Sequence, residues 1–148
     1  MKRQRGFTIV ELITVVIIIS ILASIALVGS NYVQKQARDN ERKSDVLLLK
    51  NAIEKYYDDN GSYPAVCPVA GNSCSAVLYL TTPLVPKYIS SIPNPPSSYG
   101  AGYYPYVSYP ATNSTQYAFL VQNESDDDCK TGTNMVASWW SSAPNCSY

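Results

Sequence analysis

Residues 6–29 read GFTIVELITVVIIISILASIALVG, and the rest of the chain is organised around them. The run from Phe7 to Val28 has 22 residues, and its only charged side chain is that of Glu11. About 20 apolar residues are enough for a helix to cross the hydrocarbon core of a membrane. A helix also satisfies its own backbone groups in lipid. We therefore expect residues 7–29 to form a membrane-inserted helix.

Glu11 is the unusual residue of this segment. A carboxylate within hydrocarbon costs about 2.5–3.5 kcal/mol, and less near the interface, so it implies a function and a partner group. A basic leader, residues 1–6, precedes the segment and indicates a cytoplasmic N-terminus. An ordinary secretory signal has a shorter apolar run. An uncleaved signal anchor explains the length, but neither the acid nor the pair Gly6-Phe7.

The stretch from Gly6 to Leu12, GFTIVEL, stands between this leader and an unbroken apolar run. It closely resembles the N-terminal signal of type IV prepilins and pseudopilins. The resemblance implies that a membrane-embedded prepilin peptidase cleaves between Gly6 and Phe7 and methylates the new N-terminus at Phe7. It also implies that Glu11 pairs with the N-terminal amine of a neighbouring subunit during assembly. Many pilins have a proline in the membrane half of the helix, which this chain lacks.

By this resemblance the chain is expected to be a structural subunit of a type IV pilus-like filament. It would be held in the cytoplasmic membrane by one span, with its head outside, and then moved into a surface filament or pseudopilus. The implied partners are identical or related pilin subunits, prepilin peptidase, a membrane assembly platform and, before assembly, the lipid bilayer. Three alternatives remain open: a pseudopilin of a type II secretion or competence-type system, a minor adhesive or DNA-uptake pilin, and an anchored enzyme.

Residues 30–60 are predicted to continue the helix as an amphipathic stem, since they contain neither proline nor glycine. Apolar side chains recur there at helical spacing: Val46, Leu49, Ile53, Tyr56 and Tyr57. Leu47 and Leu48 make the stem apolar on a second side, which indicates either packing against other subunits or additional core contact. The pair Asn60-Gly61 is expected to end the helix. One helix from Phe7 to Asp59 would then be about 80 Å long.

Residues 61–148 are expected to form a small extracytoplasmic head. Three segments have strand character: residues 103–108, 116–122 and 134–140. Pro105 limits the first of them to an edge or bulged strand. The second should pack its apolar side chains on the stem, namely Tyr117, Phe119 and Val121 against Ile53 and Tyr56. The predicted fold class is therefore α+β and pilin-like, with one long N-terminal helix packed against a small antiparallel sheet.

Four cysteines behind an export signal indicate disulfides formed in an oxidising compartment. Three connectivities are possible, and we expect the pairing of sequence neighbours, Cys67–Cys74 and Cys129–Cys146. Zinc is the alternative, but the chain has no histidine and no Cys-x-x-Cys pair.

Catalytic chemistry is not indicated, because the absence of histidine removes a histidine-based triad or acid–base pair. Nucleic-acid binding is not expected either, since Lys87 and Lys130 are the only basic residues after Asn60. The cluster Asp126, Asp127 and Asp128 is a weak candidate for calcium. Consecutive aspartates point in different directions, so a solvated turn without a cofactor is expected. The tyrosines of residues 99–109 should be packing residues, with an exposed binding platform as the alternative.

Overall fold

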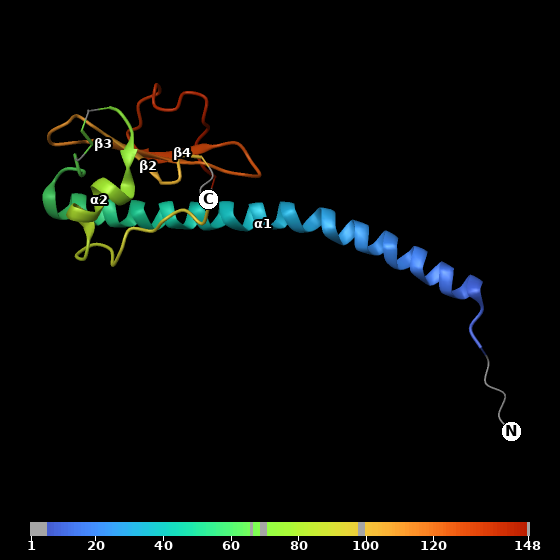
Figure 1. Cartoon of the computed structure of the whole chain (residues 1–148). Helices are drawn as coiled ribbons and strands as arrows, with labels where there is room; N and C mark the ends of the chain where they lie inside the picture. Colours follow the sequence, from blue (N-terminus) through green and yellow to red (C-terminus); the bar gives the residue numbers. More distant parts are fainter. Residues whose placement is uncertain (1–5, 66, 69–70, 98–99, 148) are drawn as a thin grey trace. The chain divides into compact units, whose positions relative to one another are not determined.

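The computed structural model describes residues 6–147, except for residues 66, 69–70 and 98–99 and the side chains of residues 26–30. Its elements are, in order, α1 (Ile9–Asn60), β1 (Cys74–Ser75), α2 (Ala76–Leu84), β2 (Pro105–Tyr109), β3 (Gln116–Val121) and β4 (Cys129–Thr133) (Figure 1). A long N-terminal helix and a small antiparallel sheet confirm the predicted α+β class. The chain divides into two compact units, Met1–Lys35 and Gln36–Tyr148.

Helix α1 ends where the sequence predicts. The backbone N–H of Gly61 donates to the carbonyl oxygen of Tyr57 at 2.8 Å. Gly61 has a φ of +69°, a left-handed conformation that glycine adopts without strain. The predicted bounds, Phe7 to Asp59, differ by two residues at the start and one at the end.

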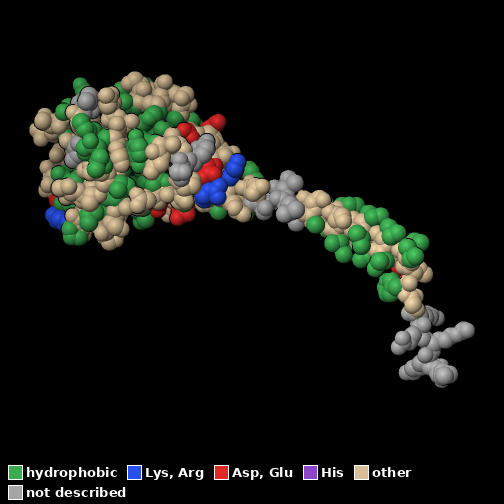
Figure 2. Space-filling model, viewed as in Figure 1, with side chains coloured by type: hydrophobic (Ala, Val, Ile, Leu, Met, Phe, Trp, Pro, Cys, Tyr) green, Lys and Arg blue, Asp and Glu red, His purple; other side chains and the backbone are tan. Residues whose placement is uncertain are grey.

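The first unit exposes its apolar side chains. All described side chains of residues 6–25 are exposed, including Ile9 at 78% and Leu22 at 61%. Figure 2 shows hydrophobic side chains covering the visible face of this segment. Residues 26–29 of the predicted membrane segment have side chains outside the described set. Within the described part of the chain, no helix is both long and apolar enough to span a membrane.

The second unit contains an antiparallel sheet with the strand order β1-β2-β3-β4. Strand β3 confirms the best of the predicted strands, and it pairs with β2 and with β4. The strand predicted around Pro105 is confirmed as β2. The expectation that it is an edge or bulged strand was wrong, because the short β1 pairs on the outer side of β2, with Ser75 opposite Pro105, and the register with β3 is continuous. Pro105 is the first residue of β2, a position where a missing N–H is tolerated.

The third predicted strand, residues 134–140, was also wrong. The strand lies one segment earlier, at β4. Gly132 allows β4 to approach β3, since a Cβ there would lie 2.1 Å from the carbonyl oxygen of Tyr117. Asn134, with a φ of +51°, ends the strand, and residues 137–140 form a turn. The strand therefore forms where Gly132 lets the two backbones pair, and not at residues 134–140, although their side chains favour strands.

The core of the second unit lies between α1 and the sheet. The stem residues Val46, Leu49 and Ile53 are fully buried, and Tyr56 and Tyr57 pack against them. The strand residues Tyr117, Phe119 and Val121 belong to the same cluster, which confirms the predicted packing. Leu47 and Leu48 are 41% and 53% exposed, so they are not additional core residues. The stem therefore keeps a second apolar side outside the core.

Candidate assembly site

The predicted processing site lies at the start of the described chain. Gly6 and Phe7 precede α1, and the Phe7 side chain is 80% exposed. A Cβ built on Gly6 would have no atom within 4 Å, and the backbone of Gly6 is not left-handed. Packing within the described chain therefore gives no reason for glycine at this position. Recognition of this position by another molecule would explain why it is a glycine.

Glu11 has a local partner that the sequence analysis missed. Its carboxylate accepts hydrogen bonds from the backbone N–H of Thr8 at 2.9 Å and from the Thr8 hydroxyl at 2.7 Å. The Glu11 backbone N–H donates to the Thr8 hydroxyl oxygen at 3.3 Å. This reciprocal pattern is a capping box, in which Thr8 caps the helix and Glu11 occupies its third position. The signal was present in the sequence as Thr-x-x-Glu before an apolar run.

The other described polar side chains of this segment also bond within the helix. Thr14 donates to the carbonyl oxygen of Val10 at 3.0 Å, and Ser20 donates to that of Val16 at 2.8 Å. Ser24 donates to the carbonyl oxygen of Ser20 at 2.7 Å. Such bonds from a hydroxyl to the preceding turn leave no side-chain donor that needs water. The segment thus presents apolar groups outward and satisfies its polar groups internally.

Comparison with known proteins shows which family has this N-terminal segment. A family model described as the prokaryotic N-terminal methylation motif matches residues 1–27. The type II secretion system core protein G of Dickeya chrysanthemi is 32% identical over 108 residues, which cover 69% of this chain and 67% of that protein. The chain belongs to the type IV prepilin and pseudopilin family.

Other relatives match a smaller share of this chain, 43% for the first below and 60% for the second. The type II secretion system core protein G of Aeromonas hydrophila is 36% identical over 63 residues, and the match spans 44% of that protein. A fimbrial protein of Neisseria meningitidis serogroup B is 34% identical over 93 residues, and the match spans 49% of that protein. No solved structure gave a significant match.

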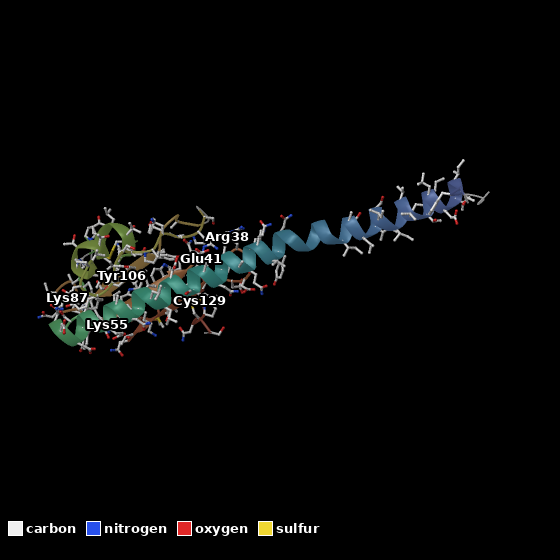
Figure 3. The ribbon with its side chains drawn as sticks, turned by 90° about the horizontal axis from the view of Figure 1, so that it is seen from below. Arg38, Glu41, Lys55, Lys87, Tyr106 and Cys129 are labelled. Carbon is white, nitrogen blue, oxygen red and sulfur yellow. A yellow bond between two sulfur atoms is a disulfide. The ribbon has the colours of Figure 1, made fainter. Side chains whose placement is uncertain are left out.

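The pilin head contains a charged cluster that sequence reasoning did not find. The carboxylate of Glu124, after β3, accepts from Arg38 Nε at 2.9 Å and from Arg38 Nη2 at 2.6 Å. Arg42 donates to Glu124 and to Asp39, and both Arg42 and Asp39 are almost fully buried. Arg38 is labelled on α1 in Figure 3. The cluster fastens the loop after β3 to the stem.

Hydrogen bonds keep both carboxylates of this cluster ionised. The pKa of Glu124 lies well below its usual range, chiefly because of the hydrogen bonds from Arg38 and then those from Arg42. Burial raises the pKa of Asp39, but hydrogen bonds from Ser125 and from the backbone of Glu124 outweigh it and lower the pKa overall. Glu124 lies 86 positions from Arg38 and 82 from Arg42, so sequence spacing did not indicate that these side chains meet.

The cysteines form two disulfides, Cys67–Cys74 and Cys129–Cys146, which is the expected connectivity. The second bridge joins β4 to the C-terminal segment. That segment is also held by backbone hydrogen bonds, from Lys130 N to Pro144 O at 2.8 Å and from Cys146 N to Lys130 O at 2.9 Å. The second bridge thus closes the loop that follows β4.

The acidic loop of residues 126–128 is closed by its own hydrogen bonds. Asn123 donates from its backbone to the Asp128 carboxylate at 3.0 Å and from its side chain to the Asp127 carbonyl oxygen at 2.7 Å. The Oδ1 atom of Asn123 is buried without a hydrogen-bond partner among the described atoms. Among the described residues, no group of three His, Cys, Asp or Glu side chains is placed to hold a metal. The expected absence of calcium binding by this loop stays a prediction to be tested.

Of the four described tyrosines in residues 99–109, two are buried, Tyr103 is half-buried and Tyr109 is 48% exposed. Tyr104 is 2% exposed and Tyr106 is fully buried. Tyr104 donates to the Asp45 carboxylate at 2.6 Å, and Tyr106 donates to the carbonyl oxygen of Pro64 at 2.8 Å. Tyr99 lies outside the described residues. The alternative of a tyrosine platform is therefore wrong for these two residues.

Proposed function

We propose that this pilin is a structural subunit of a pilus-like filament, processed between Gly6 and Phe7 and assembled through its N-terminal helix. The observation that carries the proposal is the match to the methylation motif over residues 1–27, on a segment with exposed apolar side chains. The internal bonding of its hydroxyl groups suits burial in an apolar environment. Lipid and a bundle of neighbouring stems are both such environments.

Before assembly, residues 7–29 would lie in the cytoplasmic membrane with the head outside the cytoplasm. The two disulfides support this placement of the head, because such bonds persist in oxidising compartments. A membrane platform would then move the subunit from lipid into the filament. This transfer requires little change in hydrophobic burial, since the apolar side chains leave one apolar environment for another.

Prepilin peptidase would cleave after Gly6. Packing within the described chain does not require a glycine at this position. Replacing Gly6 with a bulky residue should therefore leave the fold unchanged and keep the leader attached. Mass spectrometry of the purified chain measures this directly. A chain that loses residues 1–6 despite the substitution would contradict the proposed cleavage site.

Glu11 would serve two roles, the capping of its own helix and the pairing with the Phe7 amine of a neighbouring subunit. Substitutions separate these roles. Glu11→Gln keeps the side-chain oxygen that a capping box needs, but removes the charge. Glu11→Ala removes both. If pairing is required, both variants should insert into the membrane and fail to form filaments.

Thr8→Ala is the matched control, because it weakens the cap and leaves the Glu11 charge in place. Filament yield should be reduced less by Thr8→Ala than by Glu11→Gln. Normal filaments from Glu11→Gln would refute the charge pairing and leave capping as the role of Glu11. Electron microscopy of sheared filaments measures the filament yield. The amount of each variant in the membrane fraction measures its insertion.

A pseudopilin of a type II secretion system is the second candidate. The match to the Dickeya chrysanthemi protein, which spans 67% of that protein, favours it. Deletion of the chain would then block the release of secreted enzymes while surface fibres remain. Loss of fibres with intact secretion would favour the pilus. Neither function needs catalysis, and the pilin is proposed to be neither an enzyme nor dependent on a cofactor.

A further inference from the structure

A groove lies on the face of the sheet that carries Val107 and Ala118, and residues of the loop that follows β4 form part of its lining. That loop is drawn in red in Figure 1. Two cavities of about 410 and 510 Å³ share four lining residues there: Gly71, Asn72, Ser138 and Trp139. We call this continuous space the outer groove. The volume of each cavity falls within the range of small-molecule sites. None of its lining residues belongs to the charged cluster of the head.

The aromatic wall of the outer groove is packed against the sheet and hydrogen-bonded to β4. Trp139 is only 9% exposed and packs with Val107 and Ala118 on the outer face of the sheet. The Lys130 ammonium donates to the carbonyl oxygens of Trp139 at 2.9 Å and Trp140 at 3.3 Å. A preorganised wall loses little conformational entropy when a ligand binds.

Trp140 has an unusual backbone for a large side chain. Its φ is +45°, in the left-handed region that residues other than glycine rarely adopt. Such conformations cost free energy and persist only where the surrounding structure imposes them. Here the Lys130 contact and the backbone bond from Ala143 N to Trp140 O at 2.9 Å impose it. The strained turn places Trp140 on the wall of the outer groove.

The remaining lining is polar but uncharged. Asn72, Ser73 and Ser138 are exposed and offer amide and hydroxyl groups, and Tyr109 is 48% exposed at the rim. Among the described residues that line the two cavities, none is charged. The groove thus combines aromatic faces with neutral hydrogen-bonding groups.

From this lining we infer that the outer groove binds a neutral saccharide. A sugar ring presents C–H groups that pack on aromatic faces and hydroxyl groups that bond to amides and hydroxyls. Nucleotides also stack on aromatic rings, but their phosphates require cationic partners. Lys130, the neighbouring cation, is engaged by the two tryptophan carbonyl oxygens. The inference does not depend on filament assembly.

Saccharide binding can be measured by the intrinsic tryptophan fluorescence of the chain. Its only two tryptophans, Trp139 and Trp140, both line the outer groove, so intrinsic fluorescence reports on occupancy. The full-length protein in detergent is titrated with cellobiose, lactose, maltose and N,N′-diacetylchitobiose. At least one of them should give a saturable change in tryptophan emission. Sialyllactose, AMP and a short acidic peptide are the charged comparisons.

Two exposed positions test the site without disturbing the core. Asn72→Ala should weaken saccharide binding roughly three- to tenfold through a lost hydrogen bond. Tyr109→Ala should weaken it roughly fivefold through a lost stacking face. Tyr32→Ala is the matched control, since Tyr32 is 55% exposed and lies on the N-terminal part of α1. It should bind like the unmodified chain.

Three results would overturn the inference. The first is no saturable emission change with any neutral saccharide at tens of millimolar. The second is a stronger response to AMP or to the acidic peptide than to every neutral saccharide. The third is unchanged binding in both Asn72→Ala and Tyr109→Ala, with thermal midpoints showing that the variants are folded.

Discussion

Glu124→Ala tests whether the buried charged cluster fastens the head to the stem. The carboxylate of Glu124 accepts from Arg38, from Arg42 and, at 2.9 Å, from the Ser97 hydroxyl. The side chains of Glu124 and Arg42 are 9% and 2% exposed, respectively. Truncation therefore removes one of two carboxylates from a guanidinium that has almost no access to water.

The expected loss of stability follows from that burial. Removing one partner of a buried ion pair destabilises a protein by about 3–5 kcal/mol. Asp39 still accepts from Arg42 at 2.7 Å, so the lower end, about 3 kcal/mol, applies. For a domain of this size the thermal midpoint should fall by roughly 10–15 °C.

Thermal unfolding of the full-length chain in detergent, followed by near-ultraviolet circular dichroism, measures this shift. Asp59→Ala is the matched control, because it breaks the exposed pair with Lys87, whose N–O distance is 2.7 Å. Exposed pairs contribute little, so the control should unfold near the midpoint of the unmodified chain. A shift for Glu124→Ala no larger than that of Asp59→Ala would refute the assigned role of the cluster.

The same cluster predicts the pH dependence of stability. The folded-state pKa of Glu124 lies below its ordinary value of 4.5, so the carboxylate contributes fully above about pH 4.5. That contribution is lost as the pH falls further, because the unfolded state then binds more protons than the folded state. The lowered pKa of Asp39 acts in the same direction. Glu124→Ala should therefore lose less stability than the unmodified chain on acidification below pH 4.5.

Three further predictions concern the head. Cys129→Ser opens the loop of sequence separation 17, and the free energy of unfolding should fall by about 3 kcal/mol. Cys67→Ser opens the loop of sequence separation 7, and the fall should be about 2.4 kcal/mol. Denaturant titration measures both. The reverse order would contradict the loop-entropy explanation. Gly132→Ala should destabilise the pairing of β3 with β4, because its Cβ would lie 2.1 Å from the Tyr117 oxygen. Hydrogen exchange that stays as slow in both strands as in the unmodified chain would contradict this. Calcium at millimolar concentration should leave the thermal midpoint unchanged, since no described acidic group forms a coordination shell. A rise in the midpoint that EDTA reverses would show that the acidic loop binds the ion.

Local patterns in the sequence predicted part of the fold well. The stem stripe, the glycine stop and strand β3 each depend on neighbouring residues, so periodicity and turn chemistry were enough to place them. Strand β4 was missed because Cys-Lys-Thr-Gly-Thr has weak strand character on its own. Its backbone is held by β3 and by the C-terminal segment, which are distant in sequence.

By itself the sequence determined the N-terminal motif, the apolar segment, the amphipathic stem and the small disulfide-bonded head. These follow from composition and from spacings shorter than one element. Only the tertiary structure decided which charged side chains meet and which residues line the outer groove. The cluster of Arg38, Arg42 and Glu124 and the outer groove around Trp139 join residues more than 60 positions apart. Such contacts depend on how elements pack, and that packing is set by burial of the whole core and not by any local pattern.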